Sequence, residues 1–465
     1  MATHALNRHL VLVGFMGAGK TTVGREAAAR LGRRFVDIDA DIEQNWQLPI
    51  SELFARYGEQ EFREIEANEL RVYLNVIDPL VIALGGGAVE SPEVRQGLQR
   101  AFTVALDVEV ETAWERTRAS ERPLAQNEDE FRARYDRRQS LYDEVADASA
   151  RDADDIVLAA AGIHVEVGAL KLLGSFVEPP AALVTEPVVA GIHGADAQLA
   201  FSFAETHELP SGEAAKQLHE AERLWRALRV GRSGKIVALG GGSLTDAAGF
   251  GAATYLRGVG WIAVPTTLVG QVDAAIGGKT AIDLPEGKNL VGAFHWPLRT
   301  VIDPALLETL PAQERLNGMA EVVKTGLLAG EALWELPDPE LVRRCAAFKS
   351  ALGLRDPRDE NVRRTLNLGH TFAHALEAAA DYELPHGRAV ALGLLAALRL
   401  SGRSSDVVED VLHPEPPRVD RDRAWQALLR DKKGPLRLIL LGDDGAFETE
   451  VPQDDVRRAL DELIA

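Results

Sequence analysis

The chain has 465 residues, 46% of them hydrophobic, and a formal net charge of −20 from 51 basic and 71 acidic residues. A chain of this length is expected to form roughly two to four domains. The acidic balance argues against a broad nucleic-acid or membrane-binding surface. It does not exclude anionic small molecules, which a few buried cations can bind.

Neither a membrane segment nor a disulfide framework is expected. The longest uninterrupted apolar run, 389–398, is far shorter than the roughly 20 residues that a membrane span needs. The first apolar run, 10–16, leads into a glycine-rich loop and not into a cleavage site, so we expect no signal peptide. The single cysteine, Cys345, is typical of a reducing cytoplasm, where we expect the protein to reside.

The first third of the chain alternates short apolar runs with amphipathic stretches. Amphipathic helices are expected over 21–31 and 50–72. Strands are expected in the segments HLVLVGF, RRFVDID, LVIALGGG and AFTVALDV. Strands that alternate with helices in this way predict a parallel α/β sheet. We expect a domain boundary near 150–165, without an obvious linker.

A second α/β pattern begins after this boundary. Further strands are expected in PAALVTE, GKIVALGGG and WIAVPTT. From about 300 onward the pattern is mainly helical, and the polar, proline-bearing stretch 401–423 is expected to be a loop.

The segment from Gly14 to Thr21 fits the pattern G-x-x-x-x-G-K-[ST], between an expected strand and an expected helix. Glycines let backbone N–H groups surround phosphates, the lysine reaches the terminal phosphates, and the threonine hydroxyl ligates Mg²⁺. A glycine turn without a ligand is the alternative, and the strand–loop–helix context disfavours it. The residues expected to hold ATP are Gly14, Gly17, Gly19, Lys20, Thr21 and Thr22.

Two acidic residues, Asp37 and Asp39, are placed at the end of the second expected strand. Alternate residues of a strand point the same way, so both carboxylates can face one site. One could complete a magnesium shell while the other polarises an attacking hydroxyl. Taken alone, a solvated acidic loop explains the pair better.

An ordered set of residues then accompanies the phosphate loop: Arg63 in GEQEFREIE, the glycines 85–87, Arg122 in ERPLA and Arg138 in DRRQSLY. With the loop and the acidic pair, this set resembles shikimate kinase over about 8–155. The resemblance implies that Thr21 and Asp37 serve Mg²⁺ and that Asp39 meets the hydroxyl to be phosphorylated. It also implies that Arg63 and Arg138 hold the substrate carboxylate beside Gly86 and Gly87, and that Arg122 lies on a lid. Arginine suits this role because it pairs with a carboxylate in a bidentate manner.

The second part of the chain carries a weak dinucleotide signal, a strand ending in three glycines at 240–242 with Asp246 after it. A dense run of polar residues follows: Arg257, Thr266, Thr267, Asp273, Lys279, Lys288 and Asn289. Glu321 and Lys324 stand three residues apart on one expected helix face. Lys349, Arg363 and Asn367 come later.

Three of the chain's 11 histidines, His370, His374 and His386, are crowded together. His370 and His374 are four residues apart on one helix face, so their spacing alone favours both as zinc ligands. A solvated helix face that happens to carry histidines is the alternative.

Taken in order, these residues resemble 3-dehydroquinate synthase over about 165–465. The resemblance assigns Zn²⁺ to Glu321, His370 and His386, with Co²⁺ as an alternative metal, and leaves His374 to the substrate and proton transfers. It implies that NAD⁺ transiently oxidises a hydroxyl of 3-deoxy-D-arabino-heptulosonate 7-phosphate, that phosphate is eliminated, and that zinc acts as a Lewis acid.

The same resemblance assigns the remaining polar residues. The NAD⁺ site is expected to include Glu213, Lys216, Gly241, Gly242, Asp246, Thr266, Thr267, Lys279, Lys288 and Thr309. The substrate is expected to meet Arg257, Lys279, Lys288, Asn289, Lys349, Arg363, Asn367 and one of Lys432 and Lys433. The residues expected to take part in catalysis are Asp273, Lys279, Lys324 and His374 beside Lys20, Asp39 and Arg122 of the kinase part.

This sequence departs from the synthase pattern at several positions. Glu186 stands where the family usually has Asp, Ala373 where Gly is usual, and Arg388 where Glu is usual. The stretches 324–349 and 386–432 are also shorter than in the family.

We therefore predict a bifunctional shikimate-pathway enzyme that uses ATP with Mg²⁺, NAD⁺ and Zn²⁺. The expected fold is a P-loop domain with a parallel sheet at 1–160, a Rossmann-like NAD-binding α/β part at 161–300 and a mainly helical metal-binding part at 301–465. We expect a homodimer formed through the synthase half, without nucleic-acid or membrane partners.

Rival interpretations remain for each half. The second half could be a metal-dependent polyol dehydrogenase, which has no need for the lysines and arginine expected around a phosphate. It could also be a trimmed module that holds NAD⁺ or zinc without turnover. For the first half the alternative is another small-molecule kinase, although Arg63 and Arg138 together favour an acidic substrate.

Overall fold

The computed structural model describes residues 4–118, 127–431 and 436–465. The chain folds into two compact units, Met1–Ile163 and His164–Ala465. A parallel sheet with the strand order β2-β3-β1-β4-β5 forms the centre of the first unit. Its strands are β1 (Leu10–Val13), β2 (Phe35–Asp37), β3 (Val81–Ala83), β4 (Phe102–Leu106) and β5 (Ala148–Ala150). Its helices are α1 (Lys20–Leu31), α2 (Ile38–Trp46), α3 (Ile50–Tyr73), α4 (Pro92–Leu98), α5 (Val110–Thr117), α6 (Glu128–Val145) and α7 (Ala153–Ala160).

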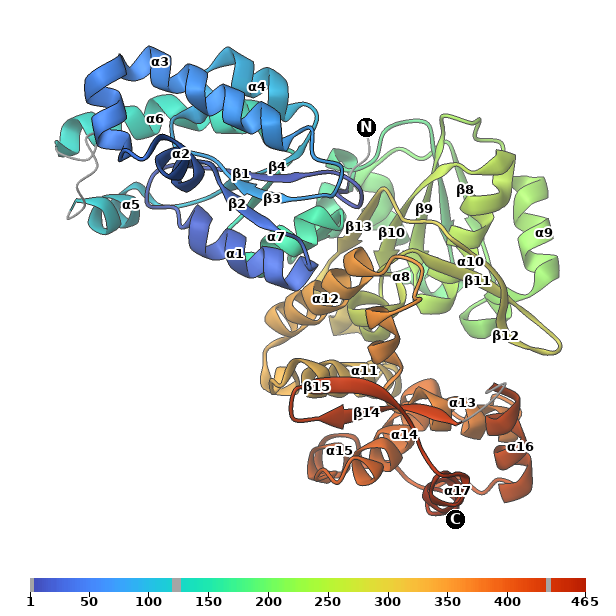
Figure 1. Ribbon diagram of the computed structural model, residues 1–465. Coiled ribbons are helices and arrows are strands. Elements are labelled where there is room, and N and C mark those ends of the chain that lie inside the picture. Colours follow the sequence, from blue (N-terminus) through green and yellow to red (C-terminus); the bar gives the residue numbers. More distant parts are fainter. Residues whose placement is uncertain (1–3, 119–126, 432–435) are drawn as a thin grey trace. The chain divides into compact units, whose positions relative to one another are not determined.

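The three central strands of this sheet are buried along their whole length because helices cover both faces. Every residue of β1, β3 and β4 is buried. Helices α1 and α7 lie on one side of the sheet, and α3, α4 and α6 lie on the other (Figure 1). The glycine-rich loop runs from the end of β1 into α1, so it stands at the carboxyl edge of the sheet, where ligands of open α/β sheets bind.

Two details of the first unit differ from the sequence-based expectations. Asp39 is not in the second strand, because β2 ends at Asp37 and Asp39 lies in the first turn of α2. The side chain of Asp37 caps this helix by accepting from the N–H of Ala40 at 3.3 Å, which ends the strand two residues early. Helix α3 is interrupted at Gly58, whose φ of 81° belongs to the left-handed region.

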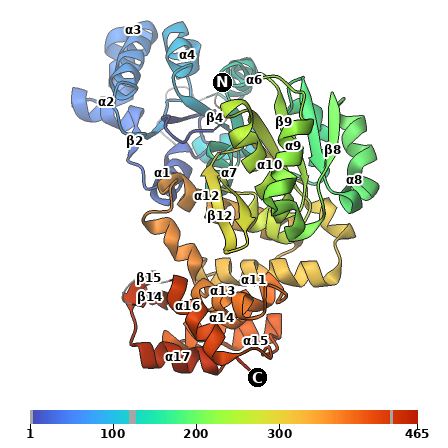
Figure 2. The ribbon, with the colours of Figure 1, turned by 90° about the vertical axis from the view of Figure 1, so that its right-hand side faces the viewer.

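The second unit is built on a six-stranded sheet with the order β6-β13-β10-β9-β7-β8. Its strands β8 and β9 can be followed in Figure 2. Its strands are β6 (Ile163–Val165), β7 (Ala181–Thr185), β8 (Glu205–Glu208), β9 (Lys235–Gly240), β10 (Gly260–Pro265) and β13 (Arg299–Ile302). The elements beside it are α8 (Pro187–Ala200), α9 (Leu218–Ala227), α10 (Gly242–Thr254), the hairpin β11 (Lys279–Leu284) with β12 (Gly287–Phe294), and the short turns η2 (Ala169–Ser175), η3 (Gly212–Lys216), η4 (Tyr255–Arg257), η5 (Gly270–Ala274) and η6 (Pro304–Thr309).

Alternate residues of the central strand feed two separate cores. Ile236 and Ala238 pack into a cluster with residues of α9 and α10, whereas Val237 and Leu239 pack into a cluster with residues of η2 and α8. This two-sided burial places the glycines after β9 at the start of α10, at the carboxyl edge of the second sheet.

The rest of the second unit is mainly helical. Its helices are α11 (Ala312–Ala329), α12 (Asp338–Arg355), α13 (His370–Ala379), α14 (His386–Leu400), α15 (Asp406–Leu412), α16 (Arg421–Asp431) and α17 (Gln453–Asp461), with the turns η7 (Leu333–Glu335) and η8 (Val362–Asn367). The fold class predicted from sequence is confirmed. The expectation of a loop over 401–423 is wrong because α15 lies inside it, and the hairpin β14 (Arg437–Gly442) with β15 (Gly445–Glu450) was not expected. Within the described ranges we find no helix with both the length and the apolar content to cross a bilayer.

Glycines allow helix α14 to approach its two neighbours very closely. A Cβ on Gly387 would overlap the backbone of Asn317 in α11. A Cβ on Gly393 would overlap the carbonyl of Gly369, which stands immediately before α13 with a φ of 79°. The neighbouring atoms are backbone and cannot turn aside, so a side chain at either position would force the helices apart.

We predict that Gly393→Ala destabilises the second unit by about 1–3 kcal/mol, because overpacking at this contact outweighs the gain in helix propensity. Denaturant unfolding followed by circular dichroism measures the change. Gly191→Ala is the matched control, since Gly191 lies in α8 and a Cβ there would have no atom within 4 Å. Equal unfolding midpoints for the two variants would contradict this account of the packing.

Candidate active sites

The glycine-rich loop of the first unit has the backbone geometry of a phosphate-binding loop. Gly14, Gly17 and Gly19 adopt φ values of 144°, 84° and 88°, and a Cβ on Gly14 would lie 2.7 Å from the carbonyl oxygen of Leu106. The ammonium of Lys20 folds back over the loop and donates to the carbonyls of Gly14 at 2.6 Å and Phe15 at 3.1 Å. The charged end of Lys20 therefore lies at the loop, at the N-terminus of α1.

The acidic pair lies beside this loop. The hydroxyl of Thr21 donates to Asp37 Oδ2 at 2.6 Å, so two oxygen donors suited to Mg²⁺ meet at the start of α1. Although Asp39 lies in α2, it faces the glycine turn 85–87, because a Cβ on Gly85 would lie 2.7 Å from Asp39 Oδ1. This turn lies beside the phosphate loop, since a Cβ on Gly86 would lie 3.4 Å from the carbonyl oxygen of Gly14. The two carboxylates thus reach one region by a helix cap and a helix turn, and not by alternation along a strand.

Two arginines converge on the next glycine of this turn. A Cβ on Gly87 would overlap the guanidinium of Arg63 and lie 2.8 Å from Arg138 Nη2. Arg138 is almost fully buried, and Arg63 pairs with the buried Glu66. Burial raises the pKa of Glu66 to about 7 despite the opposing effect of Arg63. The glycine turn 85–87 is therefore flanked by the buried guanidinium of Arg138 and the largely buried guanidinium of Arg63.

Two observations complete the first site. The hydroxyl of Tyr142 donates to the carbonyl of Gly86 at 2.6 Å and fixes the backbone of the turn. Arg116, which the sequence analysis did not select, donates to the carbonyl of Gly17 in the phosphate loop at 3.0 Å. No motif spacing marks Arg116, because its contact depends on how α5 packs. Arg122 lies outside the described residues.

A cavity of about 1400 Å³ occupies the second unit. Most of the polar residues selected from the sequence line it: Glu213, Lys216, Gly241, Gly242, Asp246, Thr266, Thr267, Asp273, Lys279, Lys288, Asn289, Thr309, Lys324, Lys349, Arg363, Asn367, His370, His374 and His386. Arg257 does not line it and lies in the turn η4 after α10. Lys432 and Lys433 lie outside the described residues, and Arg430 of α16 lines the cavity instead.

One end of the cavity is a buried charge cluster around Lys216, near the glycines that open α10. Its ammonium lies 3.3 Å from Asp246, 3.4 Å from Glu213 and 3.6 Å from Asp283. Burial would lower the pKa of Lys216, but these carboxylates raise it overall. Glu186 lies at the end of β7, where its carboxylate accepts from the N–H of Gly241 at 3.1 Å.

The middle of the cavity is lined by cations. Lys349 Nζ lies 2.6 Å from Asp273 Oδ1, and burial lowers the pKa of Lys349 to about 8, with Asp273 opposing and Arg363 adding to the shift. Arg363 is buried, and its Nε and Nη2 have no hydrogen-bond partner within the described part of the chain. Lys279 pairs with Asp359. Buried guanidinium nitrogens without partners fit an anionic ligand.

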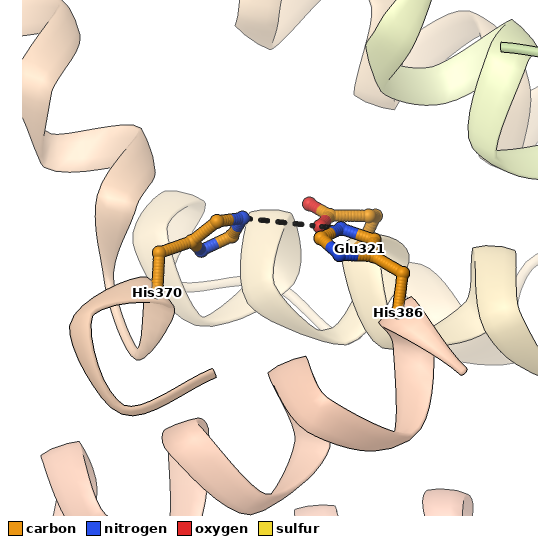
Figure 3. A group of neighbouring side chains, drawn as sticks. All are labelled: Glu321, His370 and His386. Carbon is orange, nitrogen blue, oxygen red and sulfur yellow. Dashed lines mark hydrogen bonds and ion pairs between the residues drawn. The ribbon is translucent and has the colours of Figure 1, made fainter. Parts of the chain in front are cut away.

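Three helices bring together the candidate metal ligands (Figure 3). Oxygen and nitrogen atoms of Glu321 in α11, His370 in α13 and His386 in α14 all lie within 4.8 Å of one another. Glu321 Oε1 lies 3.5 Å from His370 Nε2 and 3.3 Å from His386 Nε2. Burial would raise the pKa of Glu321, but Lys324, His370 and His386 hold it well below its usual range.

The outer nitrogens of both histidines face oxygen acceptors. His370 Nδ1 lies 3.2 Å from the carbonyl of Leu368, and His386 Nδ1 lies 3.3 Å from Glu377 Oε1. With hydrogen on each Nδ1, both rings direct the lone pair of Nε2 toward the carboxylate of Glu321, an arrangement that a cation between them stabilises. Burial would lower the pKa of His386, but Glu321 and Glu377 raise it to about 10.

Glu377 is a residue that the sequence analysis missed. It is buried in α13, and besides His386 it lies 3.8 Å from the ammonium of Lys288. The only signal in the sequence was its place three residues after His374, on the helix that carries His370.

Comparisons with known proteins match both units. The shikimate kinase family matches residues 16–161, and the N-terminal and C-terminal families of 3-dehydroquinate synthase match residues 206–317 and 318–433. The 3-dehydroquinate synthase of Bordetella pertussis is 37% identical over 341 residues, which are 64% of this chain and 95% of that protein. The 2-epi-5-epi-valiolone synthase ValA of Streptomyces hygroscopicus is 27% identical, with a TM-score of 0.58 over 65% of this chain and 96% of that one. Shikimate kinase from Acinetobacter baumannii is 40% identical over 31% of this chain and 82% of that one, with a TM-score of 0.30.

The two units thus define a fusion of two biosynthetic enzymes, a small-molecule kinase followed by a synthase. The chain belongs to the 3-dehydroquinate synthase family and carries a shikimate kinase domain ahead of the synthase. It is accordingly a bifunctional shikimate-pathway enzyme with both activities, as the sequence predicted. The polyol dehydrogenase interpretation of the second half is not supported.

We predict that Glu377→Gln weakens zinc binding about 10–100-fold, because the amide no longer orients His386 with a negative charge. Competition with a chromogenic chelator measures the affinity directly. Glu383→Gln is the control, since Glu383 follows the same helix but is exposed. An E377Q protein that keeps zinc as tightly as E383Q would show that Glu377 serves only to pack the helix.

Proposed function

We propose that the kinase unit transfers the γ-phosphoryl group of ATP to the 3-hydroxyl of shikimate with the residues around the phosphate loop. Lys20 and the loop N–H groups hold the phosphates, and Thr21 and Asp37 supply oxygen ligands for Mg²⁺. Asp39 accepts the proton of the attacking hydroxyl, and Arg122 neutralises charge on the transferred group. Arg63 and Arg138 bind the substrate carboxylate beside Gly86 and Gly87. The supporting observation is that both guanidinium groups converge on Gly87, next to Gly86, whose carbonyl accepts a hydrogen bond from Tyr142.

The synthase unit acts on 3-deoxy-D-arabino-heptulosonate 7-phosphate in this proposal. The carrying observation is that one cavity is lined by the glycine turn after β9, the unpartnered nitrogens of Arg363 and the histidines of the metal triad. ValA, a relative in fold, has a solved structure with NAD⁺ and Zn²⁺ bound. When bound here, NAD⁺ would accept and return a hydride, and Zn²⁺ held by Glu321, His370 and His386 would polarise the substrate oxygen.

The chain's own residues orient the synthase substrate and move its protons. Lys279, Lys349, Arg363 and one of Lys432 and Lys433 bind the phosphate and carboxylate, whereas Arg257 does not line this cavity. His374, on the same face of α13 as His370, transfers protons at its imidazole nitrogens, and the ammonium of Lys324 stabilises developing negative charge. Asp273 holds Lys349 at the middle of the cavity. The NAD⁺ end is formed by Glu213, Lys216, Gly241, Gly242, Asp246, Thr266, Thr267, Lys279, Lys288 and Thr309. Lys288, Asn289 and Asn367 also meet the substrate.

We also propose the setting in which the enzyme works. Residues 161–300 form its NAD-binding part and 301–465 its zinc and substrate part. Two chains associate through the synthase half, and the protein resides in the cytoplasm without nucleic-acid or membrane partners. The acidic net charge supports the absence of nucleic-acid and membrane partners, and the single cysteine supports the cytoplasmic location.

The two activities provide internal controls for each other. We predict that His370→Ala lowers phosphate release from the heptulosonate phosphate by roughly 100-fold or more, because the metal loses a ligand, and leaves shikimate phosphorylation unchanged. Lys20→Met should have the converse effect, since only the phosphate loop loses its cation. Both rates are measured on the full chain with ATP, Mg²⁺, NAD⁺ and Zn²⁺ present. A variant that loses both activities equally would argue against two separate sites.

A pH dependence follows from the buried Lys349. Its pKa of about 8 means that the ammonium binds the anionic substrate below pH 8 and loses its charge above it. We therefore predict that kcat/KM of the synthase reaction falls above about pH 8. In Lys349→Arg the guanidinium stays charged, so the fall should move to higher pH. Identical pH profiles for the two proteins would show that another group controls the reaction.

A further inference from the structure

Glu90 places a carboxylate between the arginines that the proposed function assigns to the substrate. It ends the short turn η1 (Ala88–Glu90), three residues after Gly87. Its Oε2 atom lies 3.0 Å from Arg138 Nη2 and 3.9 Å from Arg63 Nη2. Its Oε1 atom lies 3.1 Å from Arg137 Nη2. One oxygen of Glu90 thus stands at the position that a bound carboxylate would need.

The chemistry of the two ligands is the same. A glutamate side chain and the substrate both present a carboxylate to a guanidinium edge, and the same nitrogen cannot form a full charge-assisted bond with both. The backbone of Gly87 stands close against both guanidinium groups, since a Cβ there would overlap Arg63 and lie 2.8 Å from Arg138 Nη2. A substrate carboxylate bound at Arg138 Nη2 would therefore compete with Glu90 for that nitrogen.

We propose that Glu90 is a built-in competitor for the substrate carboxylate and that it sets the affinity of the kinase unit for shikimate. The proposal rests on the proposed role of Arg63 and Arg138. Arg137 gives the displaced side chain a place to go, because it already holds Oε1 and its own side chain is 65% exposed. When the substrate binds, Glu90 loses its contact with Arg138 and keeps its contact with Arg137.

The same contact explains why the site tolerates such a competitor. The side chain of Arg138 is only 1% exposed, and in the described ranges Glu90 is the carboxylate within ion-pair distance of it. A buried guanidinium without a counter-charge destabilises the fold. Glu90 therefore stabilises the substrate-free kinase unit and weakens substrate binding by the same interaction.

Kinetics and calorimetry of the full chain test the proposal. We expect Glu90→Gln and Glu90→Ala to lower KM and Kd for shikimate about three- to tenfold, because the competent fraction of sites rises. The KM for ATP and kcat should stay within about twofold. The thermal midpoint without shikimate should fall, and shikimate should raise it by more than in the parent protein. Glu111→Gln is the matched control, because Glu111 pairs with Arg132 on the surface, 2.8 Å apart, outside the site.

A second arginine variant separates the possible failures. Arg138→Lys should raise KM for shikimate, and adding Glu90→Gln to it should then bring little further change, because the two residues act through one contact. If Arg138→Lys raises KM but neither Glu90 variant lowers it, Glu90 does not compete and the inference is wrong. A rise in KM in the Glu90 variants would overturn it too, and would make Glu90 a positioning residue for Arg138. An unchanged KM in Arg138→Lys would overturn both the carboxylate site and the competition.

Discussion

Pairing of buried cations with carboxylates is the constraint on which both sites depend. Arg138 with Glu90 and Lys349 with Asp273 each place a buried cation beside its counter-charge. An isolated buried charge would shift its pKa or destabilise the fold, so anion-binding groups inside a protein need partners before a ligand arrives. The carboxylates compensate the charge of these buried cations. A negatively charged substrate would then either compete with the carboxylate for the cation or bind the cation in addition to it.

Lys349 shows how far this compensation goes. Asp273 opposes the effect of burial, yet the pKa of Lys349 remains about 8, because Arg363 and Lys324 also lie near. The cationic cavity is therefore only partly neutralised, and within the described ranges Nε and Nη2 of the buried Arg363 have no hydrogen-bond partner. In the kinase unit the balance differs, since Glu90 already pairs with Arg138. Under the two proposals above, a competing carboxylate limits affinity in the kinase unit, and loss of a proton from Lys349 limits it in the synthase unit.

Backbone packing supplies the second constraint. The metal triad needs three helices at short range, and a helix pair is normally 8–10 Å apart because of its side chains. Gly387 and Gly393 remove those side chains where α14 meets α11 and α13. Of the departures of this chain from the synthase pattern, Ala373 lies at the contact between α13 and α14, since a Cβ on Gly393 would lie 3.2 Å from its backbone nitrogen. Arg388 bonds to the carbonyl of Glu415.

Local patterns were sufficient to predict much of this enzyme. The phosphate loop, the strands and the order of the arginines are readable because each depends on residues that are close in sequence. Asp39 was assigned to the wrong element because a helix cap by Asp37 ended the strand, and a strand or a cap is compatible with the same residues. Glu90, Arg116 and Glu377 could not be selected, because their roles come from partners 48, 99 and 9 positions away, respectively, that only the fold brings near.

Those long-range contacts also explain why the two activities can be joined in one chain. Each unit has its own buried core, and the pairs Arg138–Glu90 and Lys349–Asp273 each lie inside a single unit. The product of one reaction is not the substrate of the other, so the chemistry gives no motive for passing an intermediate between the sites. The fusion therefore does not require one site to depend on the other. Fixed stoichiometry of two enzymes of the same pathway is the simplest advantage that such an arrangement provides.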